Sequence, residues 1–109
     1  MRLLIALAIF VLPICALAQP APSALPSTER QRELVHLVRQ DCGSCHGMTL
    51  QGGLGPSLKP EVLRDKPAES LVATIFGGRP GTPMPPWHRF LTEAEAQWIV
   101  EKLLGGFPE

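Results

Sequence analysis

The sequence predicts a small all-α domain, and three observations lead to this fold class. Three stretches carry apolar residues at the i, i+3, i+4 spacing of a helix that packs one face against a core. Segments rich in Gly and Pro separate these stretches, which limits each helix to a few turns. No segment of the sequence shows the apolar-polar alternation that is typical of a half-buried strand.

The first 18 residues have the composition of a cleaved export signal. Arg2 supplies the positive start, Leu3 to Leu12 is almost wholly apolar, and small residues lead to Ala18. A membrane anchor is the alternative, but Pro13 interrupts a run that would need about 20 apolar residues to span a bilayer. A lipid anchor on Cys15 is a weaker alternative. We therefore expect cleavage after Ala18, a periplasmic location and no stable membrane anchor.

Export and charge together restrict the expected partners. Removal of the leader takes away Arg2 and leaves nine Lys and Arg side chains against ten Asp and Glu. Nucleic acid and anionic membranes both need a basic protein surface, so neither is expected as a partner. Protein partners are expected instead. Cleavage also removes Cys15, which leaves Cys42 and Cys45 as the cysteines of the exported domain.

The exported chain is expected to begin with a tether and a helix. Residues 19 to 27 are rich in Pro, Ala and Ser, which favours a semi-extended tether, and the domain itself is expected over residues 28 to 109. Thr28 and Gln31 have the spacing of a capping box, which predicts a first helix from about Glu29 to Asp41 or Cys42. Its apolar side comprises Leu34, Leu37 and Val38, flanked by Val35.

The middle of the chain is expected to contain one helix between two loops. Residues 47 to 60 hold four Gly and two Pro, a composition that predicts an irregular loop without a helix. A second helix is predicted from Pro67 to Phe76, with proline in its first turn and Gly77 as its terminator. Residues 77 to 87 are expected to return to loop.

The last helix has the clearest local signals. Thr92 and Glu95 form a second capping box, and Gly105 is expected to end the helix. Its apolar stripe comprises Ala96, Ile99, Val100 and Leu103. Trp98 lies off this stripe, and we expect it to pack at the edge of the core rather than to form a docking surface.

Cys42, Cys45 and His46 form a Cys-x-x-Cys-His motif, which is typical of covalent haem attachment. The two sulfurs would add across the haem vinyl groups, and the imidazole would bind the iron from the same side. One alternative is a redox dithiol, which needs strands alternating with helices. The other is half a zinc site, to which only His36, His46 and His88 could add ligands. The export signal favours haem. We therefore predict one haem c, which would also act as the centre of a domain with a small core.

Four side chains could supply the sixth iron ligand: Met48, Met84, His36 and His88. Met48 is too close to the motif histidine to reach across the ring, and His36 is interpreted as a solvated residue. Met84 lies in the segment 81–87, where three prolines restrict the backbone. We predict Met84 as the second metal ligand, which implies a higher potential. His88 is the alternative ligand. In that case the Met84 side chain would only fill a gap in the core.

Pro56 is predicted to support the motif histidine. Its carbonyl could accept a hydrogen bond from the ring nitrogen of His46 that does not face the iron, which would orient the imidazole. Candidates for the apolar wall around the haem are Leu58, Leu63, Leu71, Ile75, Trp87, Phe90 and Ile99.

The chain resembles the class I cytochromes c of bacteria over residues 28 to 106. The matching segments are Cys42 to His46 (haem motif), Gly55 to Leu58 (the loop after it), Met84-Pro85 (distal ligand loop) and Thr92 to Leu104 (closing helix). The resemblance implies the small class I cytochrome c fold, with three to four helices around one covalent haem and the first and last helices packed crosswise. Lys102 departs from this class, which often has an aromatic residue there, and Trp98 is expected to replace that packing.

More narrowly, Gly77 to Trp87 looks like the corresponding segment of the small c-55X cytochromes of denitrifying bacteria, which are encoded beside the haem c/haem d1 nitrite reductase. The resemblance implies a non-enzymatic one-electron carrier whose redox partners include that reductase. The carrier would either donate electrons to the reductase or act during maturation of its haem d1. A haem enzyme or gas-binding protein with an open or labile sixth iron position is the alternative. An assembly factor for another haem protein is a third interpretation.

Overall fold

The structure, a computed structural model, describes residues 25–109, and these residues form helices and loops without a strand. The elements in chain order are α1 (Thr28–Leu37), the π-helical turn η1 (Val38–Cys42), α2 (Gly43–His46), α3 (Pro60–Leu63), α4 (Ala68–Gly77) and α5 (Glu93–Gly105). The predicted all-α fold class is therefore confirmed. The expected leader and most of the expected tether lie outside the described residues. Within residues 25–109, every helix is too short or too polar to cross a membrane.

The first helix begins one residue earlier than predicted. Ser27 is its N-cap, and the Ser27 hydroxyl accepts a hydrogen bond from the backbone N–H of Arg30 at 3.2 Å. Gln31 instead donates from its side chain to the Pro26 carbonyl at 2.8 Å. The predicted capping box of Thr28 and Gln31 is therefore wrong. Two adjacent hydroxyl residues were both eligible as caps, and the extended backbone of Ser27 decides between them.

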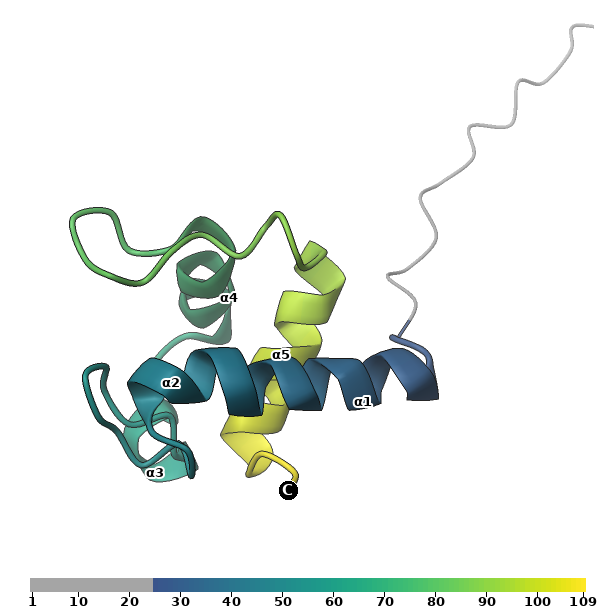
Figure 1. Cartoon of the computed structure of the whole chain (residues 1–109), viewed down its shortest axis with the longest axis horizontal. Helices are drawn as coiled ribbons and strands as arrows, with labels where there is room; N and C mark the ends of the chain where they lie inside the picture. Colours follow the sequence, from purple (N-terminus) through teal and green to yellow (C-terminus); the bar gives the residue numbers. More distant parts are fainter. Residues whose placement is uncertain (1–24) are drawn as a thin grey trace, which may run out of the picture.

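The same helical stretch also runs further than predicted. It widens to a π turn over η1, returns to α geometry in α2 and continues to His46, so the predicted end at Asp41 or Cys42 is wrong. Gly47 ends the stretch at a φ of 91°, which favours glycine. A Cβ on Gly47 would also lie 2.6 Å from the carbonyl oxygen of Gly52. The whole Cys-x-x-Cys-His motif therefore belongs to one continuous helical stretch of α1, η1 and α2, which we call the first helical rod (Figure 1).

A short helix that was not predicted begins at the last residue of the predicted loop. α3 begins with Pro60, whose missing N–H costs nothing at the first helical position, and its Leu63 side chain is 4 % exposed. α4 follows almost at once. It begins at Ala68 after Pro67, which is the N-cap rather than a first-turn residue, and it continues to Gly77. Both boundaries of the predicted second helix therefore shift by one residue.

α5 matches its prediction closely. The Thr92 hydroxyl accepts from the Glu95 N–H at 3.2 Å, and the Glu95 carboxylate accepts from the Thr92 N–H at 2.8 Å, so the capping box is confirmed. The four residues of the predicted stripe are all buried. Trp98 is also buried, at 5 % exposure, and the Lys102 ammonium lies 5.5 Å from the centre of its ring. The expected packing role of Trp98 is confirmed.

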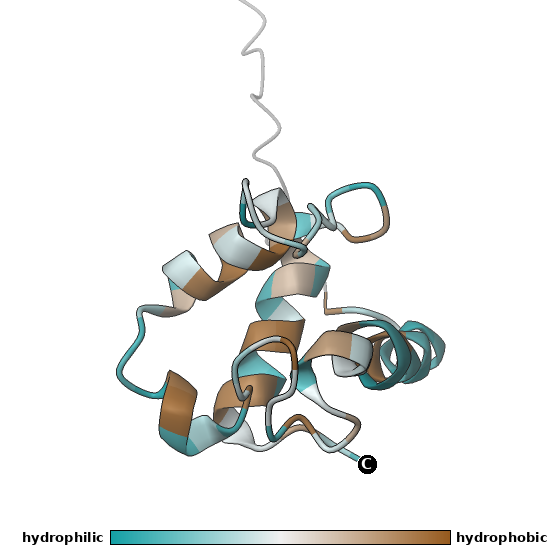
Figure 2. Cartoon of the chain, turned by 60° about the vertical axis from the view of Figure 1, so that its left-hand side comes forward, coloured by the Kyte–Doolittle hydropathy of each residue, from teal (hydrophilic) through white to brown (hydrophobic). Residues whose placement is uncertain are grey.

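The core forms where α5 crosses the first helical rod, and α4 packs along α5 (Figure 1). Its fully buried members are Leu34, Val38, Leu50, Leu63, Leu91, Trp98, Ile99 and Leu103. Arg30 joins the two crossing helices, because its guanidinium donates to the Glu95 carboxylate at 2.6 Å. Figure 2 shows the polar outer turns of α1 in teal and the more apolar α3, α4 and α5 with brown segments.

Candidate haem site

The two thiols of the motif lie at the end of the first helical rod. Cys42 is the last residue of η1, and Cys45 lies in α2 one turn later. Both are half-buried, and neither forms a disulfide within the described residues. Burial raises the pKa of the Cys42 thiol to about 11, with the charge of Asp41 as a second cause. A redox dithiol acts through a thiolate of lowered pKa, so this environment disfavours the dithiol interpretation.

His46 is held by the loop that follows it. Its Nδ1 lies 2.7 Å from the carbonyl oxygen of Pro56. Because a carbonyl can only accept, Nδ1 donates in this contact, which leaves Nε2 as the ring nitrogen available to a metal. The contact expected between Pro56 and His46 is therefore present in the structure. Such a hydrogen bond fixes the orientation of an imidazole that binds a metal.

The loop wraps closely around the end of α2. The N–H of Gly55 donates to the Cys45 carbonyl, and the N–H of Gly52 donates to the His46 carbonyl, both at 2.8 Å. A Cβ built on Gly55 would lie 2.8 Å from both Cε1 and Nδ1 of His46. The backbone at Gly55 therefore lies directly against the imidazole. Sequence analysis missed this role, although a glycine next to the proline that contacts the histidine is the available signal.

Leu50 anchors the same loop in the core. It adopts a φ of 62°, which costs a leucine about 1 kcal/mol or more, yet its side chain is only 2 % exposed. Its carbonyl accepts a hydrogen bond from the Leu58 N–H at 2.9 Å. Burial of the side chain compensates for the unfavourable backbone. The loop that holds His46 is thus fastened to the core at Leu50 and to α2 at its glycines.

Met84 comes from the other long loop. The Met84 carbonyl accepts from the Arg79 N–H at 3.1 Å, and the Trp87 N–H donates to the Ile75 carbonyl of α4 at 3.1 Å. Gly78 begins this loop at a φ of 68°, where a Cβ would lie 2.6 Å from the backbone of Pro85. The loop is therefore folded back on the end of α4. Figure 1 shows α2 between this loop and the loop that follows α2, both at the same end of the molecule.

The other candidate ligands lie in different surroundings. His36 is exposed on α1, and Met48 is 63 % exposed beside the motif. His88 is also exposed, and its ring lies 5.8 Å from the ring of Phe76, measured between centroids. Met84 itself is half-buried.

The apolar residues predicted for the haem wall divide into three groups. Leu63 and Ile99 are fully buried in the core. Four others are half-buried and pack against that core: Leu58, Leu71, Ile75 and Trp87. Phe90 is 63 % exposed, and its ring centroid lies 5.8 Å from that of Trp87, so its place in the haem wall stays a prediction.

The donor set suits a haem. A haem iron takes four ligands from the porphyrin and needs one or two from the protein. One imidazole with a free Nε2 and two thiols within a single helical turn provide the attachment points on one side. Within residues 25–109, no group of three or more His, Cys, Asp or Glu side chains is placed to hold a bare metal ion. The half-buried apolar side chains supply the surface that a porphyrin face would cover.

Comparison with known proteins agrees with this donor set. The family model described as cytochrome C oxidase, cbb3-type, subunit III matches residues 29–101. The chain belongs to the c-type cytochromes. Cytochrome c55X of Pseudomonas aeruginosa is 56 % identical over 97 residues, which are 89 % of this chain and 78 % of that protein. The resemblance to the c55X cytochromes is therefore confirmed.

Solved structures support the same relationship. The c-type cytochrome NirC superposes with a TM-score of 0.73 at 59 % identity, covering 74 % of this chain and 95 % of NirC. The small all-α cytochrome c fold is thus confirmed. The structure described as dihydro-heme d1 dehydrogenase NirN in complex with DHE matches with a TM-score of 0.58 at 38 % identity, over 63 % of this chain and 15 % of that one. A unit similar to this chain therefore forms a small part of that larger protein.

Proposed function

We propose that the chain is a periplasmic one-electron carrier with a single haem c attached through Cys42 and Cys45. Haem supplies an iron that changes between the ferrous and ferric states by gaining or losing one electron. The observation that carries the proposal is the 2.7 Å contact between Nδ1 of His46 and the Pro56 carbonyl. It leaves Nε2 available for ligation and holds the ring in one orientation.

Met84 is proposed as the ligand on the opposite side of the haem. Its backbone is fixed from both directions, because its carbonyl accepts from Arg79 and its N–H donates to the Thr82 hydroxyl at 3.3 Å. A thioether ligand raises the reduction potential relative to a second histidine. A closed sixth position also keeps small molecules from the iron, which favours an electron carrier over an enzyme.

The proposed partners belong to the haem d1 system of denitrification. The chain is similar to cytochrome c55X and to NirC over most of the length of both proteins. A similar unit also occurs within the dihydro-heme d1 dehydrogenase. We therefore propose electron exchange with the haem c/haem d1 nitrite reductase, either as its donor or during maturation of its haem d1.

The ligand set is tested with Met84→Ala and its control His88→Ala, both produced with haem-attachment machinery. The expected wild-type ferric spectrum is low-spin and shows the far-red band of methionine ligation. Met84→Ala should lose that band and become high-spin, whereas His88→Ala should retain the wild-type spectrum. An unchanged Met84→Ala spectrum would show that another residue binds the iron.

The carrier role is tested by mixing the reduced protein with oxidised haem c/haem d1 nitrite reductase in a stopped-flow instrument. Oxidation of the cytochrome at a rate proportional to the reductase concentration is expected. Absence of electron exchange with the reductase, together with rapid peroxide turnover or ligand binding at the iron, would instead support the enzyme or gas-binding alternative.

A further inference from the structure

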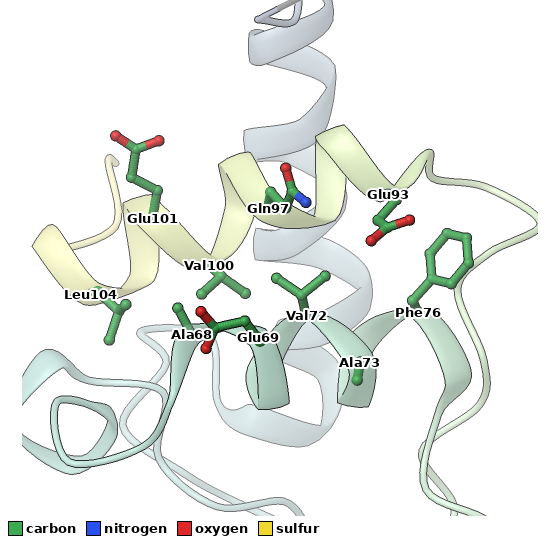
Figure 3. Close-up of a pocket in the computed structure, with 10 residues that line it drawn as sticks. All are labelled: Ala68, Glu69, Val72, Ala73, Phe76, Glu93, Gln97, Val100, Glu101 and Leu104. Carbon is green, nitrogen blue, oxygen red and sulfur yellow. The ribbon is translucent and has the colours of Figure 1, made fainter. Parts of the chain in front are cut away.

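An apolar groove of about 540 Å³ lies between α4 and α5 (Figure 3). Val72 of α4 and Val100 of α5 point toward one another across it, with Phe76 near one end and Leu104 near the other. The remaining residues that line it are Ala68, Glu69, Ala73, Glu93, Gln97 and Glu101. None of the proposed haem-binding residues contributes to this lining, so the groove is a separate surface.

α4 carries more apolar residues than the ones that pack against the core. Six of its ten residues are Ala, Leu, Val, Ile or Phe, yet none of these ten described residues is fully buried. Leu71 and Ile75 pack against the core, whereas Val72 and Phe76 face the groove. A surface helix normally has one apolar stripe toward the core and a polar opposite side. The second apolar face of α4 therefore marks a contact surface.

The charge at the groove selects the kind of partner. Three carboxylates line it, from Glu69, Glu93 and Glu101, and no Lys or Arg of the described residues does so. The ion pairs within residues 25–109 join Arg30 to Glu33 and to Glu95, so they do not neutralise these three groups. An apolar floor beside uncompensated negative charge is complementary to a segment that carries both apolar and basic side chains.

We propose that this groove docks a partner-protein segment that inserts an apolar side chain against the half-buried Val72 and Phe76 and places Lys or Arg beside the three carboxylates. The proposal rests on the proposed function, because the partner meant is the haem protein with which the chain exchanges electrons. The volume accommodates a few side chains, which suits the small interface of a transient electron-transfer complex.

The charge contribution is tested with the triple variant Glu69→Gln, Glu93→Gln, Glu101→Gln. Its matched control is Glu29→Gln, Glu61→Gln, Asp65→Asn, which removes the same charge from exposed positions outside the groove. The probe is the haem c/haem d1 nitrite reductase, with affinity measured by calorimetry and electron exchange by stopped flow. We expect the groove variant to bind about tenfold more weakly at low salt, since each exposed charge pair contributes up to a few-fold, and the control to change little.

The apolar floor is tested with Ala73→Lys, which places a cation in the groove, and with Ser70→Lys on the same helix outside it. Ala73→Lys should weaken binding by a similar factor, and Ser70→Lys should not. If the wild type binds and exchanges electrons while groove and control variants behave alike, the docking proposal is wrong and the carrier function stands. If the wild type neither binds nor exchanges electrons with the reductase, both proposals fail.

Discussion

Substitution of Gly55 by alanine perturbs the support of His46 with a single methyl group. The backbone at Gly55 passes so close to the imidazole that the new Cβ would lie 2.8 Å from two ring atoms and 3.3 Å from Nε2. The same backbone also donates to the Cys45 carbonyl at 2.8 Å, which limits how far the loop can retreat. The imidazole must therefore tilt, or the loop must move away from α2.

The expected cost follows from that distance. Ordinary van der Waals contact begins at 3.4 Å, so the ring or the loop has to shift by about 0.6 Å. Insertion of an extra methyl group into a well-packed site typically costs about 1–3 kcal/mol, and we expect about 2 kcal/mol here. Gly77→Ala is the matched control, because a Cβ there meets nothing within 4 Å and the residue is helical. That control should change stability by at most about 1 kcal/mol, in the stabilising direction.

Guanidinium unfolding of the haem-loaded proteins measures this difference, and the ferric absorption spectrum reports on the tilt of the imidazole. We expect Gly55→Ala to unfold at lower denaturant concentration and to show a shifted or partly high-spin spectrum. Wild-type stability combined with an unchanged spectrum would refute the idea that the backbone at Gly55 constrains His46.

Three further predictions concern the core and the helix crossing. Leu50→Ala should cost about 2–4 kcal/mol of unfolding free energy in denaturant, because the side chain is 2 % exposed. Its control Leu54→Ala, at 94 % exposure, should cost less than about 0.5 kcal/mol. Equal effects would contradict the anchoring role of Leu50. Trp98→Ala should cost about 3–5 kcal/mol, and a near-neutral result would show that this ring does not support the core. Arg30 holds the pKa of the Glu95 carboxyl below its ordinary value, so their interaction contributes stability above the ordinary Glu pKa and is lost as the pH falls through the lowered value. Arg30→Ala should therefore cost about 1 kcal/mol of unfolding free energy at neutral pH and little at about pH 2, and a loss independent of pH would contradict the ion pair as its cause.

Elements set by short-range signals were predictable from the sequence. The capping box of Thr92 and Glu95 needs only residues three positions apart, and both of its hydrogen bonds are present. Trp98 was expected to pack at the edge of the core although it lies off the apolar stripe of its helix, and it is buried. Ser27 and Thr28 show the limit of this reasoning, since both are good N-caps and only the backbone geometry separates them.

Features that depend on distant parts of the chain were not predictable. The left-handed backbone of Leu50 is tolerated only because the side chain reaches the core, which no local pattern announces. The π turn that leads into Cys42 has no sequence signal either. The groove between α4 and α5 requires two helices whose packing is known only from the structure. The contact between His46 and Pro56 was expected because the motif and the following loop lie close in sequence.

Covalent haem attachment is tested most directly by the intact mass and absorption spectrum of the exported protein, made in cells that also mature another c-type cytochrome. We expect the mass of the polypeptide from residue 19 plus one haem, together with a Soret band, and loss of both the added mass and the band in a Cys42→Ala, Cys45→Ala variant. A polypeptide mass without haem and no Soret band, while the other cytochrome in the same cells is fully loaded, would contradict the proposed site.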